Sequence, residues 1–154
     1  MADRAALIAT YKDGAAEIER AVAGLTDAQL DHRPGPGEWT AREVIHHLAD
    51  AETRSGVRLR QLLAEDDAVI QGYDEEQYAR TLHYDRPIAT SLALIRAVRD
   101  ATSELLDLLS DADFERTGTH TESGPYSVTT WLELYAAHGH DHASQIRAAA
   151  AAGA

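Results

Sequence analysis

Histidine is the residue in this chain whose type and spacing could do chemistry. The chain has eight histidines and no cysteine, so a metal site built on thiolates is excluded. His138 and His142 are four residues apart, which places their rings one turn apart on the same face of a helix. Two imidazoles in that arrangement can approach one cation. The spacing predicts a chelating pair; the alternative is a buried pair that hydrogen-bonds to neighbouring groups.

Helical angles sort the nearby histidines. On a helix that advances about 100° per residue, His140 lies about 180° from the pair and is expected to face solvent. On an earlier predicted helix, His47 lies about 60° from the centre of the apolar stripe and His46 about 160° from it. We therefore expect His47 to point inward and His46 to point away. If the helices are neighbours, His47, His138 and His142 hold one metal ion, with positions left open as in catalytic zinc sites.

The residues beside these histidines narrow the chemistry further. Asp50 follows His47 by one turn and is the candidate catalytic residue, because it could orient a ligand or a bound water. Its alternative role is a solvated partner for Arg54. His138 is followed by Gly139 and not by glutamate, so the H-E-x-x-H motif of zinc proteases is absent. The predicted helices also lack the inward glutamates of a di-iron carboxylate bundle.

Length and charge limit the class of protein. The 154 residues predict a single domain spanning 1–154. With 26 acidic and 14 basic residues the formal charge is −12, so nucleic acid and anionic membranes are not expected as partners. No run of about 18 apolar residues occurs, and we expect a cytoplasmic protein. Because the chain has no cysteine, any thiol chemistry must use a thiol that arrives as a ligand.

Four amphipathic helices must position these side chains. Apolar residues recur at spacings of three and four along four segments, and the alanine-rich composition with a single phenylalanine favours helix over strand. The expected helices span about 3–23, 41–62, 85–110 and 128–150. The predicted fold is therefore an all-α four-helix bundle.

Local signals mark where the second helix begins and where the chain must cross the bundle. Thr40 is the expected N-cap, Glu43 is its capping-box partner, and Trp39 is placed to pack against Val44. The segment 65–85 is acidic and irregular, with one short helical stretch at 74–80. That length predicts a long crossover connection or a segment that covers a site.

Two motifs in this chain resemble those of the DinB/YfiT-like superfamily. Residues 39–52 (WTAREVIHHLADAE) are similar to the family's W-[ST]-x-[RK]-E-x-x-x-H-x-x-D-x-E signature. Residues 135–146 (YAAHGHDHASQI) are similar to its H-x-x-x-H helix followed by Q-I. The resemblance covers nearly the whole chain. It implies a four-helix bundle with an unusual handedness of connection, frequent homodimers, and a divalent ion such as zinc or nickel held by His47, His138 and His142.

The activity that this resemblance implies is less specific. Some relatives are metal-dependent hydrolases, and others transfer or isomerise groups with a low-molecular-weight thiol. Our first hypothesis is a metal-dependent S-transferase, in which the metal lowers the pKa of an incoming thiol. The alternatives are a metal-dependent hydrolase, for which no general base is obvious in the sequence, and a metal-binding bundle without catalysis.

The remaining expectations concern ligands. Three imidazoles allow zinc, nickel, copper or iron, and the expected partner is a small-molecule substrate. His32, His83 and His120 fall in connectors, where solvent-facing roles are usual, although His120 could reach the rim of the site.

Overall fold

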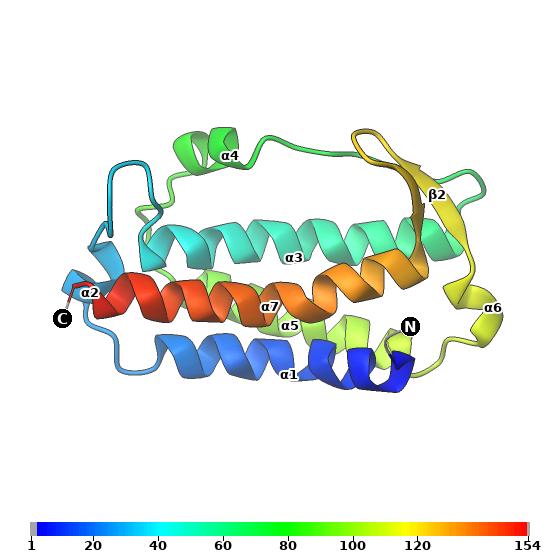
Figure 1. Cartoon of the computed structure of the whole chain (residues 1–154), viewed down its shortest axis with the longest axis horizontal. Helices are drawn as coiled ribbons and strands as arrows, with labels where there is room; N and C mark the ends of the chain where they lie inside the picture. Colours follow the sequence, from blue (N-terminus) through cyan, green and yellow to red (C-terminus); the bar gives the residue numbers. More distant parts are fainter. Residues whose placement is uncertain (1–2, 154) are drawn as a thin grey trace.

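Four long helices form the body of the protein. The computed structural model describes residues 3–153. The helices run side by side along the long axis of the molecule (Figure 1). In chain order they are α1 (Arg4–Val22), α3 (Ala41–Ala64), α5 (Ala89–Leu106) and α7 (Val128–Ala151). The predicted four-helix bundle is confirmed.

The sequence signals at the helix ends explain most of these boundaries. The Thr40 hydroxyl accepts a hydrogen bond from the Glu43 N–H at 3.1 Å, and the Glu43 carboxylate accepts one from the Thr40 N–H at 2.8 Å. Helix α3 therefore begins at Ala41, as predicted. The third helix is shorter than predicted. α5 begins at Ala89, not at 85, because residues 82–88 form a turn that packs against α3. It ends at Leu106.

Short elements occupy the connectors. The helices are α2 (Asp27–Asp31), α4 (Glu75–Thr81) and α6 (Asp111–Phe114), of which only α4 was predicted. Three strands that the sequence did not predict form a small sheet: β1 (Val69–Ile70), β2 (Thr117–His120) and β3 (Gly124–Ser127). β1 pairs with β2 in parallel, with Val69 opposite Thr119, and β2 pairs with β3 in antiparallel. This small sheet is an addition that the sequence did not predict, and the all-α four-helix bundle remains the fold class.

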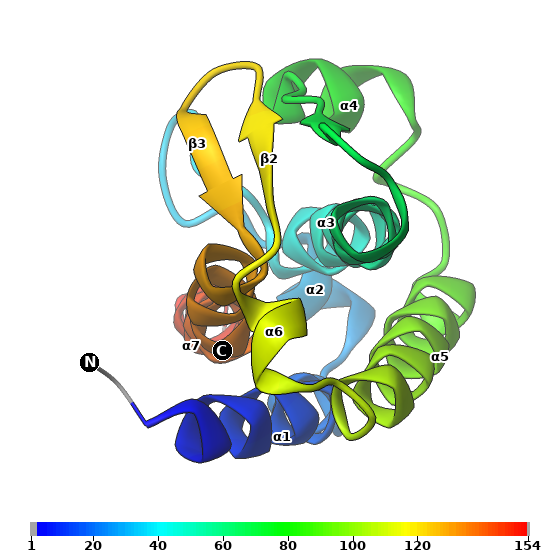
Figure 2. The same ribbon diagram turned by 90° about the vertical axis from the view of Figure 1, so that its right-hand side faces the viewer.

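The two long connectors lie on one side of the bundle. α3 packs against α5 and α7, whereas α1 packs mainly against α7. Viewed along the bundle, α4 and the β2–β3 hairpin lie over the side formed by α3 and α7, away from α1 (Figure 2). The crossover at 65–88 thus covers the face that carries the histidines. Within residues 3–153, no helix combines the length and hydrophobicity needed to cross a bilayer.

The interior consists of two apolar clusters with a polar layer between them. One cluster is built around Tyr11, Leu59 and Trp131, and the other around Ile18, Leu48 and Ile146. All four long helices contribute groups to a buried ion pair in this layer. It joins Arg99 Nη2 of α5 to Glu52 Oε1 of α3 at 2.7 Å, and both side chains are almost inaccessible to solvent.

Arg99, on α5, contacts the other three long helices. Its guanidinium donates to the backbone carbonyls of Tyr11 at 2.7 Å and Tyr135 at 3.0 Å, besides Glu52. Glycines make room for it: a Cβ at Gly14 would lie 2.1 Å from Arg99 Nη1, and one at Gly139 would lie 3.0 Å from Nη2. The guanidinium therefore sets how closely α1 and α7 approach the centre of the bundle.

This packing predicts that Gly14→Ala destabilises the protein. Alanine favours a helix over glycine by about 1 kcal/mol, but here the added methyl group collides with a buried guanidinium that has no free space. We expect a net loss of about 1–3 kcal/mol in the free energy of unfolding, measured by urea denaturation. Gly139→Ala, with its longer contact, should cost less. A Gly14→Ala variant as stable as the parent would contradict the prediction.

Candidate metal centre

Three imidazoles meet between α3 and α7. His47 comes from α3, and His138 and His142 come from successive turns of α7. The ring centroids are 4.8 Å apart for His47 and His142, 5.8 Å for His47 and His138, and 4.5 Å for His138 and His142. One nitrogen from each ring lies within 4.8 Å of the other two. The structure thus brings together the three histidines that helical angles selected.

The burial and protonation of these histidines suit metal ligands. His47 is only 1% exposed, and its Nδ1 and that of His138 are buried without a hydrogen-bond partner. Burial, together with a smaller effect of the neighbouring His142 and His138, lowers the pKa of His47 to about 3. Burial and the proximity of His138 also lower the pKa of His142. An uncharged imidazole keeps one nitrogen lone pair for a cation, and the three rings converge, so the donor set fits a divalent transition metal.

Two further side chains lie against the outer nitrogens of the α7 histidines. His142 Nδ1 lies 2.7 Å from the carboxamide oxygen of Gln145, which can only accept, so Nδ1 carries the proton and Nε2 is free. His138 Nδ1 lies 3.7 Å from Glu52 Oε1. Sequence reasoning assigned no role to Glu52, although it ends the first family motif. Its position between Leu48 and Ser55 in the buried stripe of α3 was the available signal.

An aromatic stack supports His47. The Trp39 ring lies edge-on to His47 with centroids 5.0 Å apart, and Tyr84 packs edge-on against Trp39 with centroids 6.4 Å apart. Asp50 accepts a 2.6 Å hydrogen bond from the Tyr84 hydroxyl. The structure therefore links Asp50 to His47 through Tyr84 and Trp39, and its role as an orienting group stays a prediction. Trp39 also packs against the apolar cluster that contains Val44.

Arg54 does not pair with Asp50 in the contacts of residues 3–153. Its guanidinium donates to the Tyr78 hydroxyl at 3.2 Å and to the Gln71 carbonyl at 3.0 Å. It also lies over the Tyr73 ring, 4.4 Å from the centroid. Arg54 thus fastens α4 and the crossover segment to α3.

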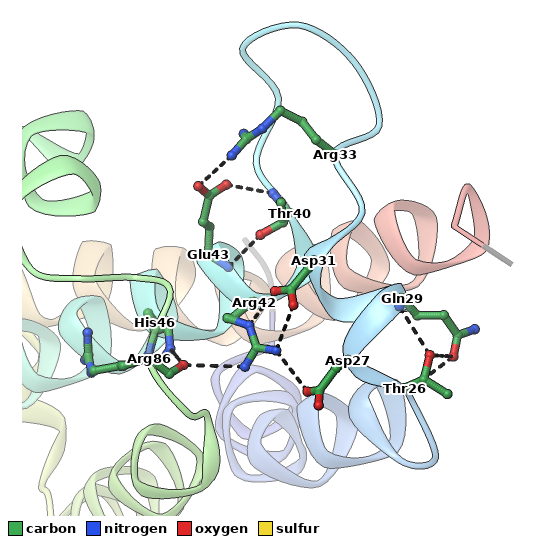
Figure 3. Close-up of polar contacts among 10 residues, drawn as sticks. All are labelled: Thr26, Asp27, Gln29, Asp31, Arg33, Thr40, Arg42, Glu43, His46 and Arg86. Carbon is green, nitrogen blue, oxygen red and sulfur yellow. Dashed lines mark hydrogen bonds and ion pairs between the residues drawn. The ribbon is translucent and has the colours of Figure 1, made fainter.

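The expectation that His46 points away from the core is wrong. His46 is 0% exposed, because residues 82–91 cross the face of α3 that carries it. Its Nε2 lies 2.9 Å from the Arg86 carbonyl, which fixes the proton there, and its Nδ1 accepts from the Ser91 hydroxyl at 2.8 Å. Figure 3 shows the contact to Arg86. His46 is therefore a satisfied structural histidine.

Arg42, one turn before His46, fixes the start of α3. It bonds Asp31 at 2.6 Å and Asp27 at 3.0 Å, which docks α2 against α3 (Figure 3). Beyond it, Arg33 pairs with Glu43 at 2.8 Å. These contacts hold both ends of the loop that carries Trp39 to the histidine cluster.

Two cavities open beside the three histidines. The larger, about 410 Å³, is lined by His47, His142, Trp39 and carboxylates of the loop and of α4. The smaller, about 250 Å³, is lined by His138, Tyr73, Arg58 and His120 among others. His120 thus lies at the rim, as the sequence allowed. Glu75, the first residue of α4, lines both cavities. Space for a small ligand therefore exists on both sides of the cluster.

A second group of possible ligands is a weaker candidate. Asp13, Glu17 and His140 also bring three ligand atoms together, on α1 and α7. Arginines already neutralise its carboxylates: Arg20 pairs with Asp13 at 2.9 Å and with Glu17 at 2.7 Å, and Arg147 pairs with Glu17 at 2.6 Å. Arg147, near the end of α7, is thus an ion-pair partner of Glu17. The three-histidine cluster remains the candidate metal centre.

Known proteins are similar to this chain in sequence and in the arrangement of their helices. A curated protein of Oceanobacillus iheyensis is 40% identical over 129 residues, which are 84% of this chain and 75% of that protein. A protein of Bacillus mycoides is 34% identical over 130 residues, with the same two shares. Both bear the name "Putative metal-dependent hydrolase".

A solved structure and a family model agree with these relatives. YfiT from Bacillus subtilis, described as "a probable metal-dependent hydrolase with an unusual four-helix bundle topology", superposes with a TM-score of 0.89 at 29% identity. The match covers 97% of this chain and 88% of that one. The model of the DinB superfamily matches residues 10–146. The chain therefore belongs to the DinB superfamily.

Proposed function

We propose that this protein is a metal-dependent hydrolase of small molecules. The observation that carries the proposal is the set of three converging imidazoles beside two cavities. The names of the relatives and of YfiT favour hydrolysis over the thiol transfer that the sequence led us to expect. Hydrolysis therefore becomes the first hypothesis and S-transfer the second.

His47, His138 and His142 would hold the metal, with zinc or nickel as the first choices and iron or copper as further ones. A divalent cation bound by imidazoles supplies Lewis-acid chemistry: it polarises a carbonyl oxygen and lowers the pKa of a water molecule, or of a thiol, towards neutrality. The protein would supply substrate binding in the two cavities and the groups that move protons.

Glu75 is the residue that we assign to proton transfer. It lines both cavities, so a substrate that spans the histidine cluster passes beside its carboxylate. A carboxylate in such a position can accept the proton of the attacking water and return it to the leaving group. This assignment would supply the general base that is not obvious in the sequence.

Tyr73 is placed to donate a hydrogen bond in the smaller cavity. Its hydroxyl is buried without a partner, and it shares the cavity with His138. Burial raises the pKa of Tyr73 well above its ordinary value, so the group stays protonated. A protonated phenol can stabilise negative charge that develops on a carbonyl oxygen during hydrolysis.

Metal analysis tests the proposal directly. Natively purified protein should contain about one equivalent of a divalent metal, measured by elemental analysis, and His142→Ala should lose most of it. His140→Ala removes an imidazole from the same helix but from outside the cluster, and it should keep the metal. The loaded parent should hydrolyse members of a panel of small esters and amides. Metal binding without turnover on such a panel would favour the non-catalytic bundle.

Thiol transfer is tested in the same experiment. A cavity of about 410 Å³ beside His47 and His142 can accept a cosubstrate, and a chain without cysteine must receive its thiol from solution. Loaded protein is therefore also incubated with a low-molecular-weight thiol and the electrophile monochlorobimane. Turnover only with added thiol would favour the S-transferase. The expected homodimer stays a separate prediction.

Glu75→Gln should lower hydrolysis without lowering metal content. The amide keeps the size of the side chain but cannot accept a proton, and loss of a general base typically costs about 10²–10⁴-fold. We expect kcat/KM to fall by that order while elemental analysis stays at the parent value. Glu133→Gln is the matched control, because Glu133 is an exposed carboxylate on α7. Equal activity of Glu75→Gln and parent would exclude the assigned role.

The metal-free protein should lose stability as the pH falls below about 6.5. The pKa of His47 is lowered from 6.5 to about 3 in the folded state, so at pH 5 the unfolded chain binds a proton that the folded chain does not. This difference destabilises the folded state by about 2 kcal/mol at pH 5 relative to pH 7.5. Urea denaturation in a chelator at both pH values measures it, and His47→Gln should reduce the loss. A pH-independent midpoint would disprove the linkage.

A further inference from the structure

Glu52 lies between the buried arginine and the histidine cluster. Its Oε1 is 2.7 Å from Arg99 Nη2 on one side and 3.7 Å from His138 Nδ1 on the other. The side chain is 0% exposed, so no bulk water competes for the carboxylate. One short charged residue of α3 therefore touches both the structural centre of the bundle and the candidate metal centre.

Several buried polar atoms at this place lack hydrogen-bond partners, Arg99 Nε among them. Glu52 Oε2 and His138 Nδ1 are both buried and unpaired. Buried polar groups without partners are costly, and a carboxylate oxygen and an imidazole N–H can satisfy each other. The oxygen that lies 3.7 Å from Nδ1 is Oε1, which also accepts from Arg99, and this separation is less than 1 Å beyond an ordinary N–H···O contact.

We propose that Glu52 is a positioning residue for the metal: it accepts the Nδ1–H of His138 and thereby directs the Nε2 lone pair of that ring towards His47 and His142. The proposal rests on the metal site of the proposed function. A carboxylate in this role fixes both the tautomer and the ring orientation, and it increases the basicity of the ligand.

His142, the other histidine of α7 in the cluster, has an acceptor at Nδ1 as well, a carboxamide in place of a carboxylate. Gln145 accepts from His142 Nδ1 at 2.7 Å, which leaves Nε2 of that ring free for a cation. If Glu52 acts alike on His138, both α7 histidines present Nε2 to the same point. Two rings one turn apart then act as one preoriented chelate.

Arg99 keeps Glu52 in place for this role. A guanidinium is always protonated in proteins, so its buried charge requires the carboxylate as counter-ion. Two backbone carbonyls hold the guanidinium from α1 and α7. The Glu52 carboxylate therefore stays charged and fixed whether or not a metal is bound.

The competing explanation is that Glu52 serves only to neutralise Arg99. The two explanations differ for the double variant Glu52→Met/Arg99→Met, which removes both charges and keeps similar side-chain volume. Replacement of a buried ion pair by apolar residues is often neutral or stabilising. A purely structural role therefore predicts parent-like stability together with parent-like metal affinity. A positioning role predicts parent-like stability with weakened metal binding.

The experiment measures zinc affinity by competition with a chromophoric chelator, and unfolding in urea without metal, for the parent, Glu52→Gln and the double variant. We expect the double variant to bind zinc about 10–100-fold more weakly than the parent, as loss of an outer-shell partner of a metal ligand typically does. The visible absorption spectrum of the cobalt-loaded form should also change. Parent-like affinity and an unchanged cobalt spectrum in a folded double variant would overturn the proposal. Glu52→Gln gives the same readouts if the double variant does not fold.

A measurement on the unaltered protein is independent of both variants. Nitrogen chemical shifts of the zinc-loaded parent, obtained by long-range proton–nitrogen correlation, should identify His138 as protonated at Nδ1 and metal-bound through Nε2. Zinc bound through Nδ1 of His138 would refute the role of Glu52. If the parent binds no zinc at all, the metal site itself fails; if it binds zinc through the wrong nitrogen, only this inference fails.

Discussion

The buried pair of Glu52 and Arg99 is the interaction on which the rest of this structure depends. Removing two charges from water is expensive, and the cost is recovered only when geometry and additional hydrogen bonds are nearly ideal. Here the guanidinium has bonds to three different helices, and two glycines give it room on α1 and α7. A shift of any of these helices by one turn would leave a buried charge unpaired. The pair therefore specifies one register for the bundle.

That register determines what the histidines can do. The polar layer separates two apolar clusters, and His138 lies one residue before Gly139, against which the guanidinium packs. His47 is a buried residue of α3, five positions before Glu52. Without this layer no carboxylate would lie near His138 Nδ1. Glu52 of α3 thus lies against both the buried arginine and the candidate metal centre.

Features that depend on local periodicity could be predicted from the sequence, and features that depend on distant contacts could not. Apolar stripes and the Thr40–Glu43 capping box identify helices without reference to the rest of the chain. The same angles selected the three histidines that converge. His46 was misassigned because the segment that buries it lies some 40 residues later in the sequence. The strands are two to four residues long and pair across the crossovers, so they carry no period to detect.

The burial of Glu52 and Arg99 could not be predicted from the sequence for a different physical reason. A stripe assigns a face to the interior by its average hydrophobicity, so a charged residue within it counts against burial unless its partner is known. The partner lies on another helix, and only the assembled bundle brings the two together.

Metal binding and catalysis have different structural requirements in this fold. Imidazoles on adjacent turns suffice for a chelate, but reaction also needs open space and a group that accepts protons. The crossover carries Glu75, the first residue of α4, into the lining of both cavities beside the histidines, and we propose that its carboxylate accepts the proton.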